Sequence, residues 1–149
     1  MSTATLNLKR SFDAPRDAVF AAWTDPEVLR RWWAAGPDWD TPVAEVDLRV
    51  GGGYRLAMRE PGGPTHVVAG EYTEVVPPER LVYTWTWEHE SPGSVGSVVT
   101  VLFREDGDRT TVHLTHTGFT DPAAVARHEH GWHAVLDSLA RRVLAPQRA

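Results

Sequence analysis

The chain has 149 residues, of which 42% are hydrophobic and 23% charged, the size and composition of an ordinary globular domain. Fifteen Lys and Arg residues against twenty Asp and Glu give a formal net charge of −5 without a basic cluster, so we expect no nucleic acid and no anionic membrane surface as a partner. Because the chain has no cysteine for disulfides or thiolate chemistry, and no apolar run of membrane-spanning length, we expect a single cytoplasmic domain over residues 1–149.

The N-terminal part predicts one strand followed by two short helices. Residues 3–14 alternate apolar and polar side chains, the pattern of a half-buried strand. Residues 15–24 begin with a proline suited to a first helical turn. Asp25 followed by Pro26 is a typical N-cap and N1 pair, so a second helix is expected over residues 26–33.

Six further strands follow in hairpin order. The glycines at 51–53 permit a sharp turn, "PPER" turns the chain at 77–80, and "EDGD" at 105–108 is typical of a hairpin. A loop is expected over residues 90–97. The strands are predicted at residues 42–50, 54–60, 65–76, 81–89, 98–105 and 110–117.

A long C-terminal helix is predicted from the Asp121–Pro122 pair to about Leu144. At roughly 100° per residue, its apolar positions form one stripe. The stripe consists of Val125, His128, Trp132, Leu136, Leu139 and Val143. Separate helices and hairpin-linked strands define an α+β protein, in which a seven-stranded antiparallel sheet wraps around this helix.

The segment "HEHGWH", residues 128–133, resembles a metal-binding motif but has the wrong spacing. His128 and His133 diverge by about 140° around the helix, so they cannot share a metal ion, and we expect none. Gly131 costs about 1 kcal/mol relative to alanine in a helix. Two explanations are open: close packing against another element, which we favour, or space for a bound molecule beside Trp132.

Four segments of the chain together resemble a known family. They are "SFDAPRDAVFAAWTDPEVLRRWW", "EVDLRVGGGYRLAM", "GEYTEVVPPERLVYTW" and "GWHAVLDSL", and the resemblance runs from about Asn7 to Val143. They look like the bacterial domains related to the activator of Hsp90 ATPase, in the START-like superfamily. The resemblance implies a helix-grip fold, a curved antiparallel sheet around a long C-terminal helix. It also implies, commonly, a cavity between them for sterols, lipids, plant hormones or polyketides, but no catalytic motif.

We predict from these features that the protein binds a small apolar or aromatic molecule, without a cofactor. Pocket walls of this kind are mostly aromatic and apolar, with a few polar groups. Aromatic rings from three elements are expected to converge, namely those of Trp33, Tyr54, Trp85 and Trp132. They could form a plug or a pocket, and we expect a pocket. The candidate ligand-binding residues are Trp33, Tyr54, Met58, Tyr83, Trp85, Trp87, Phe103 and Trp132, with His116 and His128 as polar fixings, and for each the alternative is plain core packing.

The sequence leaves two other functions open. One is a chaperone-like protein-interaction module, which an exposed aromatic patch would support. The other is a cofactor-free polyketide-cyclase-like or hydrolase enzyme, with His116, Glu74 or Asp47 pointing inward. For Asp47 and Arg49 we favour an ion pair with a neighbouring strand. The outer face of the sheet is a candidate surface for a homodimer.

Overall fold

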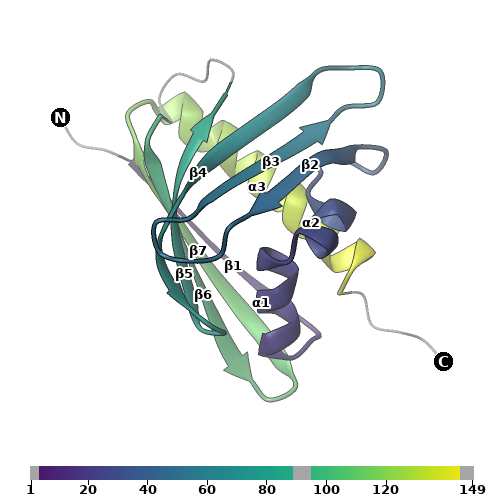
Figure 1. Cartoon of the computed structure of the whole chain (residues 1–149), viewed down its shortest axis with the longest axis vertical. Helices are drawn as coiled ribbons and strands as arrows, with labels where there is room; N and C mark the ends of the chain where they lie inside the picture. The colour runs from purple at the N-terminus through teal and green to yellow at the C-terminus, as the bar shows by residue number, and fades with distance from the viewer. Residues whose placement is uncertain (1–3, 89–94, 145–149) are drawn as a thin grey trace.

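The computed structural model describes residues 4–88 and 95–144, which form a curved, open antiparallel sheet with helices packed on one face (Figure 1). The strand order is β1-β7-β6-β5-β4-β3-β2, so the first strand pairs with the last. The strands are β1 (Ala4–Phe12), β2 (Asp40–Val46), β3 (Gly53–Arg59), β4 (Thr65–Val76), β5 (Arg80–Trp87), β6 (Ser97–Asp106) and β7 (Arg109–Phe119). The expected α+β architecture is confirmed. Of the loop predicted at 90–97, residues 90–94 lie outside the described residues, and residue 97 already belongs to β6.

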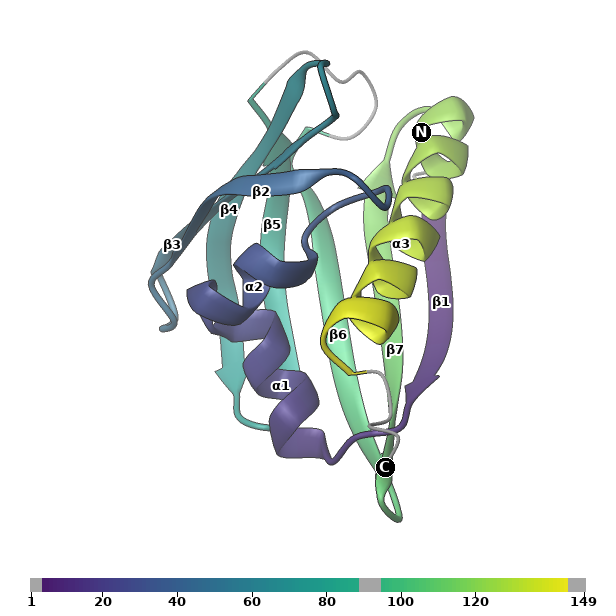
Figure 2. The same cartoon turned by 90° about the vertical axis from the view of Figure 1, so that its right-hand side faces the viewer.

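In the part of the chain that the structure describes, three helices cover the sheet (Figure 2): α1 (Arg16–Thr24), α2 (Pro26–Trp32) and α3 (Pro122–Arg142). The long helix α3 lies against β1 and β7, while α2 contacts β2 and α3. Both predicted N-caps are present, because Asp25 accepts from the backbone N–H of Glu27 and Asp121 accepts from that of Ala123. None of the helices in the described ranges is both long and apolar enough to cross a membrane.

The predicted strand 42–50 is wrong in its second half. β2 ends at Val46, and the next residues turn back on themselves, leaving Leu48 37% and Val50 63% exposed. The cause is the glycine run: a side chain on Gly52 would lie 2.1 Å from the Asp47 carbonyl oxygen, so only glycine permits this close turn. Asp47 and Arg49 form an ion pair with each other at 3.0 Å, and not with a neighbouring strand as expected.

The core lies between α3 and the inner face of the sheet. The predicted stripe of α3 is confirmed at its centre, where His128, Trp132, Leu136 and Leu139 are buried, and Val125 and Val143 at its ends are half-buried. Tryptophan side chains from α1 and α2 extend this core toward β5. The arrangement places the middle of α3 opposite the inner face of β3, β4 and β5, where the candidate site lies (Figure 1).

Candidate ligand cavity

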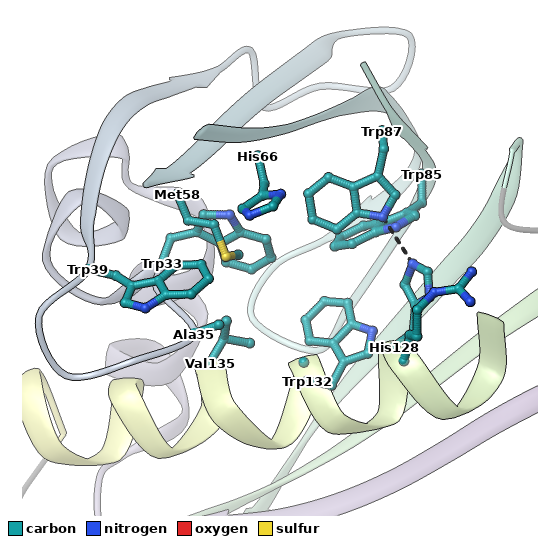
Figure 3. A pocket seen from close by; sticks show the side chains of 12 residues that line it. Trp33, Ala35, Trp39, Met58, His66, Trp85, Trp87, His128, Trp132 and Val135 are labelled. Atoms are coloured by element: carbon teal, nitrogen blue, oxygen red, sulfur yellow. Dashed lines mark hydrogen bonds between the residues drawn. The ribbon is translucent and has the colours of Figure 1, made fainter. Parts of the chain in front are cut away.

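A cavity of about 290 Å³ lies between α3, the strands β3–β5 and the loop that follows α2 (Figure 3). Five of the seven tryptophans of the chain contribute to its wall. Its described lining residues are Trp33, Ala35, Trp39, Met58, His66, Trp85, Trp87, Arg127, His128, Gly131, Trp132 and Val135. The wall is therefore mainly aromatic, and its polar groups are few.

One side of the cavity is formed by three tightly packed indole rings. Trp33, Trp85 and Trp132 come from the end of α2, from β5 and from α3, and their ring centroids lie 5.1–6.0 Å apart. These rings pack edge-on or tilted, the geometry that aromatic pairs favour, and all three are at most 3% exposed. The rings thus form both a plug and a wall: they fill the core on one side and border the cavity on the other.

His116 supports this cluster from the side that faces away from the cavity. Trp132 Nε1 donates to His116 Nδ1 at 3.1 Å, so the second ring nitrogen, Nε2, carries the proton and donates to Ser97 Oγ at 2.8 Å. The ring is fully buried, and burial, with a smaller contribution from nearby His128, lowers the pKa of His116 to about 3. His116 is therefore neutral, and its two nitrogens fix the orientation of Trp132.

His128 forms the same kind of bond directly on the cavity wall. Trp87 Nε1 donates to His128 Nε2 at 3.0 Å (Figure 3), and His128 Nδ1 donates to the carbonyl oxygen of Ala124 at 2.7 Å. Burial lowers the pKa of His128, which keeps the ring neutral and able to accept the indole N–H. The pair joins β5 to α3 across one end of the cavity.

The loop between α2 and β2 forms the wall at the opposite end. Trp39 stacks on His66 of β4 with ring centroids 5.8 Å apart, and His66 Nε2 lies 2.7 Å from Glu60 Oε2. Gly36 lies so close under the Trp39 indole that an added Cβ would be 2.6 Å from its Nε1. The Arg142 guanidinium at the end of α3 donates to carbonyl oxygens of this loop, including that of Gly36 at 3.0 Å.

Gly131 lies on the α3 wall, and the packing explanation favoured from the sequence is wrong. A Cβ added at this glycine would meet no atom within 4 Å beyond its own helix turn and chain neighbours. By contrast, a Cβ on Gly70 would lie 2.0 Å from the Thr84 carbonyl oxygen, a true close approach. The space beside Gly131 belongs to the cavity.

Six of the ten residues predicted to bind ligand line the cavity, and four do not. Those on the wall are Trp33, Met58, Trp85, Trp87, His128 and Trp132. Phe103 packs against Phe20 and Trp23, and His116 lies behind Trp132. Tyr54 and Tyr83 pack with Tyr72 around a separate void of only about 10 Å³.

Sequence reasoning missed the wall residues Ala35, Trp39, His66, Arg127 and Val135. Val135 follows Gly131 by four positions and so shares its helix face, a signal that could have found it. Trp39 occupies a loop, where no periodicity predicts direction. The acid–base candidates Glu74 and Asp47 lie at the surface in ion pairs with Arg80 and Arg49.

The histidine-rich segment of α3 does not gather its rings at one point. His128 is buried, whereas His130 and His133 are exposed on other faces of the helix. Within residues 4–88 and 95–144, no group of three or more His, Asp or Glu side chains is arranged to hold a metal ion.

Comparisons with known proteins agree with this architecture. The sequence profile of the family described as activator of Hsp90 ATPase homolog 1-like protein matches residues 13–143, so the chain belongs to this family. No curated protein shows a significant match.

Among solved structures, a protein from Chromobacterium violaceum is 29% identical, with a TM-score of 0.82 over 96% of this chain and 98% of that one. An AHSA1-like protein from Aeromonas hydrophila is also 29% identical, with a TM-score of 0.80 over 98% and 99%. A protein from Plasmodium falciparum described as an HSP90 activator is 27% identical, with a TM-score of 0.70 over 91% and 93%.

Proposed function

We propose that the protein binds a small aromatic hydrocarbon-like molecule, about two fused rings in size, in the cavity between α3 and β3–β5. The observation that carries this proposal is the gathering of five tryptophans around one cavity of about 290 Å³. An apolar cavity of about 150 Å³ is sufficient for one benzene ring, so this volume suits roughly two rings.

The polar groups on the wall support an apolar ligand. The indole N–H groups of Trp87 and Trp132 are already bonded to His128 and His116, and both nitrogens of His128 have partners. A hydroxyl group placed against these bonded groups would lose its bonds to water without a replacement, at a cost of about 1–3 kcal/mol.

The indole N–H groups of Trp33 and Trp85 have no partner among the described residues, but other atoms cover them, so they offer no donor at the cavity surface. Arg127 is the charged donor on the described wall. Selectivity should therefore favour rings without buried polar substituents.

The two alternatives receive less support. A chaperone-like role would follow the Plasmodium falciparum protein described as an HSP90 activator, but such a role calls for an exposed aromatic patch. Among the described residues, the exposed large hydrophobic side chains are all aliphatic: Leu48, Val50, Val76 and Val95. An enzyme needs titratable groups available to a substrate. On this wall both nitrogens of His128 are bonded to the protein, and Nε2 of His66 is paired with Glu60.

Calorimetry and thermal unfolding with naphthalene test the proposal. Naphthalene should bind saturably and raise the melting temperature, because a ligand bound only to the native state stabilises it by mass action. We expect 1,5-naphthalenediol, whose hydroxyl groups lie on opposite sides, to bind at least about 10-fold more weakly.

Two variants separate binding from stability. Trp87→Leu removes a wall ring and should weaken naphthalene binding, whereas Phe103→Leu lies in the core outside the cavity and should leave the affinity unchanged. If one- to three-ring aromatic compounds neither bind nor stabilise the wild type, the ligand-binding proposal fails and the interaction module becomes the better explanation.

A further inference from the structure

The α3 wall contains a glycine that the fold does not require. Gly131 lies inside a continuous helix and is not among the glycines with a positive φ, so its backbone needs no special freedom. Glycine destabilises a helix interior relative to alanine. With no atom within 4 Å of a Cβ placed there, alanine would fit without any movement of its neighbours.

The position of Gly131 shows what the missing side chain leaves open. His128, three residues earlier, and Val135, four residues later, share its helix face, and all three line the cavity together with neighbouring Trp132. A side chain at position 131 would therefore extend from the α3 wall into the space beside His128 and Val135. Glycine exposes the helix backbone there and widens the space by the volume of one side chain.

We propose that Gly131 determines the size of the ligand: it admits a flat two-ring system, which alanine would hinder and a larger residue such as leucine would exclude. This inference rests on the proposed ligand-binding function and adds a size limit set by one residue. Glycine at this position makes the helix less stable and the cavity deeper. Binding and stability should therefore respond to substitution in opposite directions.

The test uses Gly131→Ala and Gly131→Leu in the full-length protein, with naphthalene as the two-ring probe and toluene as the one-ring probe. Gly131→Ala should raise the melting temperature by about 2–4 °C, through its helix propensity. It should also weaken naphthalene binding several-fold while leaving toluene binding within about two-fold, differences that calorimetry resolves. Gly131→Leu should abolish naphthalene binding.

Ala126→Gly is the matched control, because Ala126 is exposed on the same helix and away from the cavity. It should lower the melting temperature by a similar amount and leave both affinities unchanged, which shows that affinity does not follow helix stability. Equal naphthalene binding by the wild type, Gly131→Ala and Gly131→Leu would overturn the size limit alone, and so would a lower melting temperature for Gly131→Ala. A wild type that binds neither probe would overturn the proposed function, and the size limit with it.

Discussion

At the scale of single residues, the two buried histidines act as acceptors for tryptophan N–H groups. His116 receives Trp132 and His128 receives Trp87, so each ring must stay neutral to keep its bond. The consequence is a dependence of stability on pH that comes from the interior of the protein rather than from surface ion pairs.

We predict that the free energy of unfolding falls on acidification because of His116. Its pKa is about 3 in the folded protein and 6.5 as the ordinary value, so between these limits the unfolded chain binds one more proton. Stability is therefore lost as pH falls below 6.5, by about 1.4 kcal/mol for each pH unit below about 6. Urea denaturation at pH 7, 6 and 5 measures this slope.

His116→Gln, which can still accept from Trp132 and donate to Ser97, should have a shallower slope over the same pH range. The remaining slope includes a contribution from His128, whose pKa burial also lowers. His133→Gln, on an exposed position of α3, is the control and should retain the wild-type slope. Parallel slopes for the wild type and His116→Gln would refute this account.

A second residue-scale prediction concerns Trp132. Trp132→Ala should cost about 3–5 kcal/mol of unfolding free energy, because the ring is 3% exposed, packs on Trp33 and Trp85, and leaves His116 without its donor. Chemical denaturation measures the change. A loss below about 0.5 kcal/mol would mean that the ring contributes little to the core.

At the scale of elements, the loop between α2 and β2 depends on a distant helix end. Arg142 donates to the carbonyl oxygens of Gly36, Pro37 and Trp39, and Thr41 Oγ1 donates to that of Trp33 at 2.6 Å. The loop carries Trp39, which lines one end of the cavity. Its position is therefore set by contacts made more than 100 residues away in sequence.

We predict that Arg142→Gln loosens this loop without unfolding the protein. Amide hydrogen exchange of residues 34–39 should become faster, because three guanidinium hydrogen bonds to the loop are lost. Arg141→Gln removes an exposed charge from the adjacent position and serves as the control. If both variants exchange at the same rate in this loop, Arg142 does not hold it.

The elements also show how far the sequence predicts this protein. The N-caps at Asp25 and Asp121 and the strand of residues 65–76 were predictable, because their signals are local. Tyr83 and Trp85 share a face of β5, but periodicity cannot say which of them reaches the cavity, since positions two residues apart lie about 7 Å apart along a strand. Trp39 and His66 could not be placed because they meet only through tertiary contacts of the loop.

At the scale of the whole molecule, one contiguous core joins all three helices to the sheet. The buried cluster runs from β1 through α1 and α2 to α3 and includes residues of every described strand. We predict a single cooperative urea transition, with secondary structure and tryptophan packing, followed by far-UV and near-UV circular dichroism, lost at the same midpoint. Two separated midpoints would show that the helices and the sheet unfold independently.

The tryptophans around the cavity also give the protein an optical property. Five indoles border the space in which a ligand is expected. Of the other two, Trp32 has its ring centroid 5.8 Å from that of Trp33, and Trp23 has its centroid 5.3 Å from that of Trp32. Excitation absorbed by any of these rings can migrate through neighbouring rings to the cavity wall. An occupant whose absorption overlaps indole emission would collect that energy, so the unlabelled protein would report its own ligand by fluorescence.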